Sequence, residues 1–223
     1  MLKAALDFSG SELAFAVVDG DGATVASRLV DLPGRDSSTL PILVGDALRE
    51  AGLSYDDLDS WTVGTGPGSF TALRVAAAFV LGVAQGKDKP VRGLPSACGF
   101  EGETPFGERV LVLYDGRKRE LLGFGLKREG RFWLPDGFQG VLETPDRLEA
   151  VRASYDTFAA RPCDLDAVRA FAPSLPVDPA PHVKASVLAS IPGGLCDTQP
   201  TDLIYLRPPV FVDPKPIRTF PEV

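Results

Sequence analysis

A glycine-rich loop at residues 64–69 has the residue types of a binding site. It lies between a strand-like and a helix-like apolar run, where glycines let a ligand approach the backbone and helix N–H groups attract an anion. The same residue types also fit a tight strand-to-helix turn in which Ser69 or Thr71 caps the helix, and we favour this interpretation over an anion site. Ser69 replaces the third glycine of the dinucleotide fingerprint, which disfavours a Rossmann site.

Two aspartates, Asp7 and Asp115, lie in predicted hairpins and provide the second candidate chemistry. Paired carboxylates could hold Mg²⁺ with a phosphate ligand, although aspartate in such positions more often braces a turn. His182 is the sole histidine, so an HExxH zinc site and a histidine-based triad are excluded. No P-loop motif occurs. We therefore expect no catalytic residue, no metal ligand and no cofactor of the chain's own.

Composition limits the class of protein further. The 223 residues are 44% hydrophobic and carry a net charge of −7, which is typical of a globular chain and not of one that neutralises nucleic-acid phosphates. We expect any contact with tRNA or DNA to be indirect. The three cysteines form no CxxC pair, which favours reduced thiols and a cytoplasmic location. The apolar run 75–84 is too short for a membrane span, and Asp7 interrupts any signal-peptide core, so no membrane association is expected.

The order of predicted elements indicates an α/β fold. Alternating apolar runs predict three antiparallel strands at 3–8, 13–18 and 24–32, the last two joined by a DGDG hairpin turn. Helical spacing predicts helices at 38–51 and 71–85. The remaining elements of this half are strands at 61–64 and 91–94, a capping box at 54–57 and a further helix from Pro95.

The second half begins again with a hairpin, at 109–114 and 121–127, followed by a helix that Thr144 and Pro145 start and that extends toward Tyr155. The opening hairpin motif thus recurs in weaker form in the second half. The proline-rich segment from Pro208 is expected to be an extended tail.

The helix at 71–85 is apolar on every face between Arg74 and Gln85. Such a helix must be covered on all sides. Either the preceding helix of the same chain covers it, or both helices together present a surface to another protein. We favour the second interpretation, because large exposed apolar patches are rare on monomers.

Residues 64–74 read GTGPGSFTALR and closely resemble the GxGPGSFTGLR signature of the TsaB (YeaZ) family of tRNA threonylcarbamoyladenosine synthesis. The segments DGRKRE at 115–120 and YLR at 205–207 resemble the family's DxRxxE turn and C-terminal YLR. The resemblance covers roughly the first 130 residues. The residues that match family motifs are Asp7, Gly66, Pro67, Gly68, Ser69, Phe70, Thr71, Arg74, Asp115, Arg117, Glu120, Tyr205 and Arg207.

The resemblance implies an actin-like ATPase (ASKHA, ribonuclease H-like) fold of two related lobes, 1–98 with the partner-binding helices and 99–223, and a non-catalytic scaffold role. Residues 161–181 match the family pattern little, so the second lobe is expected to be reduced. Family members pair with TsaD, the catalytic subunit, and with the ATPase TsaE, or form homodimers, and a nucleotide at a partner interface is compatible with this role. Contacts in the family use the two helices of the first lobe. Here the corresponding residues are Leu40, Leu43, Val44, Ala47, Leu73, Arg74, Ala77, Val80, Leu81 and Ala84.

The chain departs from the family pattern at several positions. Phe8 stands where threonine is frequent, and a histidine expected before the first helix is missing, which disfavours a phosphate-binding hairpin at 7–11. Ala72 replaces a glycine, and Ala76 and Ala77 add methyl groups, so we expect altered packing against a partner.

Two other functions compete with the scaffold role. The alternative is a stand-alone actin-like ATPase or sugar kinase that uses Asp7 and Asp115. A glycoprotease-like hydrolase is disfavoured because the chain has one histidine and no recognisable pair of nucleophile and base.

Overall fold

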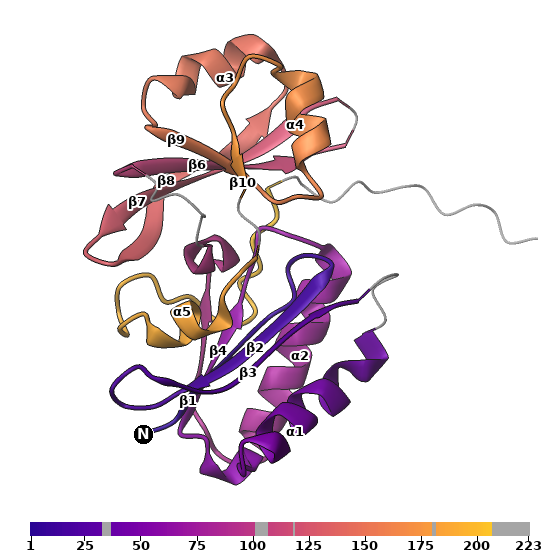
Figure 1. Ribbon diagram of the computed structural model, residues 1–223, viewed down its shortest axis with the longest axis vertical. Coiled ribbons are helices and arrows are strands. Elements are labelled where there is room, and N and C mark those ends of the chain that lie inside the picture. Colours follow the sequence, from indigo (N-terminus) through magenta and orange to yellow (C-terminus); the bar gives the residue numbers. More distant parts are fainter. Residues whose placement is uncertain (33–36, 101–106, 118, 180–181, 207–223) are drawn as a thin grey trace, which may run out of the picture.

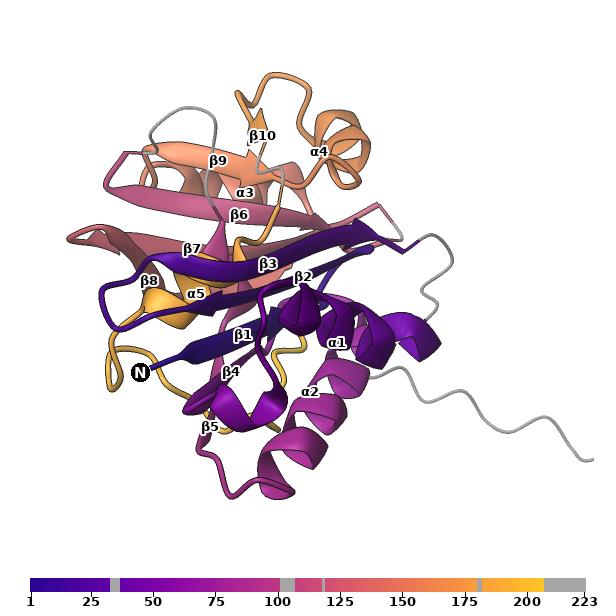
Figure 2. The same cartoon turned by 60° about the horizontal axis from the view of Figure 1, so that its bottom comes forward.

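The computed structural model describes residues 1–32, 37–100, 107–117, 119–179 and 182–206. The first half forms a five-stranded mixed sheet whose strands lie in the order β3-β2-β1-β4-β5 (Figures 1 and 2). The first three strands pair antiparallel, and β4 and β5 continue the sheet in parallel. These strands are β1 (Lys3–Asp7), β2 (Glu12–Val18), β3 (Thr24–Asp31), β4 (Ser60–Gly64) and β5 (Val91–Leu94).

The second half repeats this topology. Its strands, listed from β8, lie in the order β8-β7-β6-β9-β10. This is the order of the first sheet, with β6 to β10 corresponding in turn to β1 to β5. The repeat confirms the prediction of two related lobes. The strands are β6 (Arg109–Asp115), β7 (Leu121–Glu129), β8 (Phe132–Leu142), β9 (Thr157–Ala160) and β10 (Asp178–Pro179).

Helices occupy corresponding places in the two halves. Between the third and fourth strands lie α1 (Leu40–Glu50) and α3 (Pro145–Arg152), and between the fourth and fifth lie α2 (Phe70–Gln85) and α4 (Leu165–Phe171). The second-lobe helices have 8 and 7 residues against 11 and 16 in the first lobe. The second lobe is therefore reduced in its helices but keeps all five strands, including β10 in the segment 161–181 that matched little.

The two halves exchange their last helical segments. The 3-10 helix η4 (Ser96–Gly99) follows β5 but packs against β7 and β8, whereas α5 (Ala185–Ser190) follows β10 and packs against β1 and β2. The helix expected from Pro95 is thus only a short turn. Its last residue packs closely on the segment before α5, since a Cβ on Gly99 would lie 2.7 Å from Val183 Cγ1.

Alternating layers of helix and sheet follow from this exchange (Figure 1). One apolar cluster lies between the first sheet and helices α1 and α2, and another lies between the second sheet and helices α3 and α4. The third, central cluster joins the facing sides of both sheets through η4 and α5. No helix in the described part of the chain is long and apolar enough to cross a membrane.

Local sequence signals explain several element boundaries. Asp19 Oδ1 accepts hydrogen bonds from the N–H groups of Asp21 and Ala23, both at 2.9 Å, and so closes the β2–β3 hairpin. The predicted capping box at 54–57 is present. Thr144 caps α3, with Pro145 in the first turn, and the helix ends at Arg152. Both predicted helices of the first lobe and its five strands are confirmed to within two residues at either end.

The division at residue 98 stays a prediction, and the structure adds one feature to it. Residues of the predicted second lobe return to the first: α5 packs on the first sheet, and Thr198 forms an antiparallel bridge with Gly93 beside β5. The tail from Pro208 lies outside the described residues.

Two glycines provide a matched test of the packing in the first lobe. A Cβ on Gly64 would lie 1.9 Å from Asp7 Oδ1, whereas a Cβ on Gly82 would meet nothing within 4 Å. Gly64→Ala should lower the free energy of unfolding by about 2 kcal/mol through overpacking. Gly82→Ala, at an exposed position in the C-terminal part of α2, should raise it by about 0.5–1 kcal/mol. Urea unfolding of both variants measures these changes, and equal stabilities would contradict the described packing.

Candidate functional site

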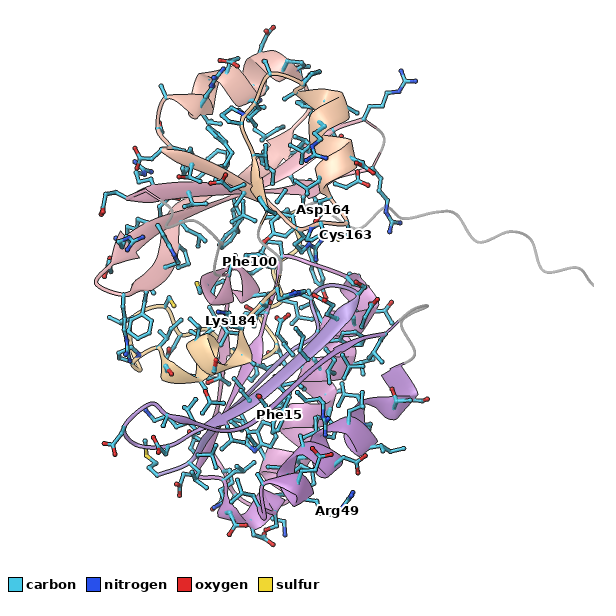
Figure 3. The ribbon with its side chains drawn as sticks, viewed as in Figure 1. Phe15, Arg49, Phe100, Cys163, Asp164 and Lys184 are labelled. Carbon is cyan, nitrogen blue, oxygen red and sulfur yellow. The ribbon has the colours of Figure 1, made fainter. Side chains whose placement is uncertain are left out.

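The motif loops meet in a cleft between the two lobes. This cleft has a volume of about 500 Å³. Figure 3 places Cys163 and Asp164 on its second-lobe side, where the lobes meet. It is lined by residues 9–11 and 67–71 of the first lobe, by 114–117, 161, 163 and 164 of the second, and by 204–206 of the returning segment. The glycine-rich loop, the DxRxxE-like turn and the YLR-like segment are therefore brought together.

The glycine-rich loop approaches the first hairpin at van der Waals distance. A Cβ on Gly68 would lie 2.2 Å from the carbonyl oxygen of Ser9, and the Ser69 N–H donates a 2.7 Å hydrogen bond to that oxygen. Ser69 is the N-cap residue of α2, but its hydroxyl makes no capping hydrogen bond. The loop is thus a tight strand-to-helix connection, while the predicted side-chain cap at Ser69 is wrong.

Asp7 is buried beneath this loop, with 2% of its surface exposed. Its Oδ2 accepts hydrogen bonds from the Ser9 N–H at 3.0 Å and the Ser9 hydroxyl at 2.8 Å. Burial raises the pKa of Asp7, opposed by hydrogen bonds from Ser96 and Ser9 and by the charge of Arg161. Phe8, the departure from the family pattern, is fully buried.

Asp115 lies in the cleft but acts within its own turn. Its Oδ1 accepts a 2.7 Å hydrogen bond from the N–H of Arg117, whose φ of 56° is left-handed. Asp7 does not line the cleft, so the structure does not bring the two aspartates to one cavity. Among the described residues, no group of three histidine, cysteine, aspartate or glutamate side chains is placed to hold a metal ion. The bracing role expected for Asp115 is confirmed.

Arg161 is a central cleft residue that the sequence analysis missed. It follows β9, and its Nε donates a 2.6 Å hydrogen bond to Asp164 Oδ2. Asp164 Oδ1 in turn accepts from the Asp115 N–H at 3.1 Å. Arg161 Nη1 also reaches the carbonyl oxygen of Ser9, at 3.4 Å, so this side chain links the second lobe to the first. No motif in the sequence marks it: the pair with Asp164 is local, but the contact with Ser9 depends on how the lobes meet.

The returning segment is fixed to the first turn of α2. The Ile204 N–H donates to the carbonyl oxygen of Thr65 at 2.8 Å. The Tyr205 ring lies 4.6 Å from the Phe70 ring, and its hydroxyl accepts a 3.3 Å hydrogen bond from Arg74 Nε. The Arg74 guanidinium also lies 3.7 Å above the Phe70 ring. Arg74 therefore anchors the segment, while Arg207 lies outside the described residues.

Helices α1 and α2 leave part of their apolar surface exposed. Ile42 is 63% exposed and Phe70 41% exposed, and Ala78 and Gly82 are also exposed. In the described part of the chain, α1 therefore does not cover α2 on all sides, as the first interpretation required, and cover by another protein stays a prediction. The residues on the outer side of the two helices are Ile42, Leu43, Phe70, Arg74, Val75, Ala78, Phe79, Leu81 and Gly82, all exposed or half-buried, and we call them the helical face.

The predicted partner contacts need a correction, because sequence periodicity does not tell which side of an all-apolar helix faces the sheet. Three of them, Leu43, Arg74 and Leu81, belong to the helical face, and their role stays a prediction. The others are at most 5% exposed and support the helices from the core; they are Leu40, Val44, Ala47, Leu73, Ala77, Val80 and Ala84.

The extra methyl groups on α2 also face inward. Ala72, Ala76 and Ala77 are 2%, 0% and 5% exposed. They contact the chain's own core, and a partner on the helical face would not touch them. The expectation that they alter packing against a partner is therefore wrong.

Comparisons with known proteins agree on one group of relatives. The family model described as "TsaD: tRNA N6-adenosine threonylcarbamoyltransferase" matches residues 35–131. The tRNA threonylcarbamoyladenosine biosynthesis protein TsaB of Haemophilus influenzae is 32% identical over 90 residues, which are 39% of this chain and 38% of that protein. TsaB of Escherichia coli is 28% identical over 128 residues, 54% of each chain. The chain thus spans about half or less of the length of these curated relatives.

A solved structure extends the likeness to the whole fold. The crystal structure of an uncharacterized Pseudomonas aeruginosa protein with similarity to peptidase YEAZ superposes with a TM-score of 0.76 at 24% identity. The match covers 92% of this chain and 99% of that one. The two-lobed α/β fold expected from the sequence is confirmed.

The buried ion pair of Arg161 and Asp164 should dominate the stability of the cleft. Their side chains are 16% and 7% exposed. Arg161→Met leaves a carboxylate buried without its partner and should lower the free energy of unfolding by about 3 kcal/mol. The control is Arg152→Met, which removes an exposed pair with Glu149 and should change it by less than about 1 kcal/mol. Similar losses in both variants, measured by urea unfolding, would contradict this assignment.

Asp7 should make stability depend on pH. Because its pKa is raised in the folded state, the neutral carboxyl stabilises the protein fully below the unfolded pKa, and this contribution is lost as pH rises through the folded pKa. Asp7→Asn keeps a neutral group at every pH. The stability of the wild type minus that of Asp7→Asn should therefore be larger at pH 3 than at pH 7. A difference that grows with pH would show that burial does not raise this pKa.

Proposed function

The homologues and structural neighbours support a TsaB/YeaZ family assignment for this chain, and on that premise we propose that it is a non-catalytic subunit in tRNA threonylcarbamoyladenosine biosynthesis. In this role it binds a threonylcarbamoyltransferase of the TsaD type through the helical face. Any contact with tRNA is made through that partner.

The exposed apolar helical face carries this proposal. Ile42 and Phe70 are among the large apolar side chains that the described chain leaves in water. Burying apolar surface against a partner contributes about 25 cal/mol per Å². Ala78 in the middle of α2 and Gly82 one turn later are small and exposed, which lets a partner helix approach closely. A surface of this kind fits a helix of another protein better than a small ligand.

The contacts of the aspartates in and beneath the cleft support a subunit without catalysis of its own. Asp7 is buried and bonded to Ser9, Asp164 is paired with Arg161, and Asp115 Oδ1 accepts from the Arg117 N–H. Each carboxylate already has a structural partner in the chain. The stand-alone ATPase or kinase would need Asp7 and Asp115 at one ligand, which the burial of Asp7 disfavours.

The proposal also includes a nucleotide at the partner interface and a third protein component. Phe70 and Thr71 line the cleft and also begin α2, so a partner on the helical face would lie beside the cleft opening. This placement supports a nucleotide held at the partner interface rather than by the chain alone. TsaE is the proposed third component, and self-association is expected when the transferase is absent.

Co-expression tests the proposal. The chain and the TsaD-type transferase of the same organism should elute together from a size-exclusion column, with the mass of a 1:1 complex by light scattering. Separate elution, together with micromolar ATP binding by the isolated chain in calorimetry, would contradict the proposal and favour the ATPase.

A matched pair of substitutions locates the surface. Ala78→Glu places a charge in the middle of the helical face, and burying it against a partner should weaken binding at least about tenfold. Ala150→Glu makes the same change on α3, where the alanine is also exposed but lies on the second lobe. Calorimetric titration should find full affinity for Ala150→Glu. Equal affinities of the two variants would exclude the helical face as the docking site.

A further inference from the structure

Two of the three cysteines lie together where the two lobes exchange segments. Cys98 belongs to η4 and is fully buried in the central apolar cluster. Cys196 belongs to the segment that returns to the first lobe after α5, and it is half-buried against the same cluster. Both thiols are free. The fold therefore brings a buried thiol and a partly accessible thiol into one cluster, although the second sheet separates them in the sequence.

The segment that carries Cys196 is held firmly against β5. Thr198 and Gly93 exchange two backbone hydrogen bonds, each with its N–H donating to the other's carbonyl oxygen at 2.9 Å. The approach is close, because a Cβ on Gly93 would lie 2.6 Å from Thr198 Oγ1. Asp197 adds a 3.0 Å ion pair with Arg92. The backbone position of Cys196 is thus fixed by its two following neighbours.

The same strand places Cys98. β5 ends at Leu94, and the turn that follows is closed by the Cys98 N–H, which donates a 3.0 Å hydrogen bond to the carbonyl oxygen of Pro95. The two thiols then interact directly: a hydrogen bond between them raises the pKa of Cys98 and lowers that of Cys196. Because the thiolate is the reactive form of cysteine, the partly accessible Cys196 is the thiol that an oxidant attacks first.

We propose that Cys98 and Cys196 form a reversible disulfide when the protein meets hydrogen peroxide. The Cys196 thiolate attacks one peroxide oxygen, the O–O bond breaks, and Cys196 sulfenic acid and one water are formed. The Cys98 sulfur then attacks the sulfenic sulfur, and the hydroxyl group leaves with the Cys98 proton as a second water. Two thiols are oxidised and one peroxide is reduced to two waters. A dithiol reductant reverses the step by thiol–disulfide exchange.

This disulfide would join η4 to the returning segment and close a loop that contains the whole second sheet. A bond that closes so long a loop restricts the unfolded chain and should raise the melting temperature by about 5–10 °C. The site lies outside the helical face, so the inference does not depend on the proposed function.

Cys163 provides a control within the same chain. It is exposed and lines the cleft, and its thiol donates to Asp164 Oδ2 at 3.7 Å. Burial raises the pKa of this thiol. Cys163 is thus easier to reach than Cys98, but its thiol is directed to a carboxylate. Accessibility alone would select Cys163 for oxidation, whereas the proposed pairing selects Cys98 and Cys196.

Peptide mapping of the full chain tests the proposal. The protein is treated with a small molar excess of hydrogen peroxide, alkylated in denaturant and digested with trypsin. Mass spectrometry should find the peptides of Cys98 and Cys196 linked to each other, with Cys163 alkylated. On a non-reducing gel the linked protein should keep the mass of one chain. The melting temperature should rise on oxidation and return to its first value with dithiothreitol.

A matched pair of variants separates the outcomes. Cys196→Ser, at the half-buried position, should abolish both the link and the rise in melting temperature, whereas Cys163→Ser should keep both. Cys98 and Cys196 that are both alkylated after peroxide treatment would overturn the proposal. So would a link that contains Cys163, a Cys196 oxidised to sulfinic acid beside a free Cys98, or a rise in melting temperature that Cys196→Ser retains.

Discussion

The close approach of the glycine-rich loop to the first hairpin is the contact on which the rest of the first lobe depends. Gly64 leaves room for the Asp7 carboxylate, and Gly68 leaves room for the Ser9 carbonyl, which binds the N–H of Ser69. Because Ser69 is the N-cap of α2, this contact fixes where the helix begins. It therefore positions both the first-lobe wall of the cleft and the helical face, because Phe70 in the first turn of α2 belongs to both.

The exchange of η4 and α5 makes the two lobes one cooperative unit. Each segment leaves its own half and packs on the sheet of the other, and the central apolar cluster includes both sheets. Arg161 adds a polar link at the cleft, from β9 to the carbonyl oxygen of Ser9. The returning segment then ends at α2, where Tyr205 contacts Phe70 and Arg74. Changes at the helical face and in the cleft are thus connected through a few residues of the first turn of α2.

The sequence predicted the features that depend on local pattern. Strand alternation, the Asp19 hairpin and the helix-start signal at Thr144 each depend on residues that are close neighbours in the sequence. The repeated hairpin at Arg109 indicated the second lobe. The features it missed depend on distant segments. An all-apolar helix such as α2 has no period that distinguishes its inner from its outer side, so Val80 was assigned to a surface although it is fully buried. Arg161 carries no motif, and its role appears only when the lobes meet.

The central claim is that the helical face is the docking surface for a threonylcarbamoyltransferase partner. Hydrogen–deuterium exchange of the chain, alone and with the TsaD-type protein of its own organism, tests it most directly. The account predicts slower exchange in peptides from α1 and α2 and unchanged exchange in α3 and α4, which lie on the far side of the second lobe (Figure 1). Protection confined to the second lobe, with α1 and α2 unchanged, would contradict it.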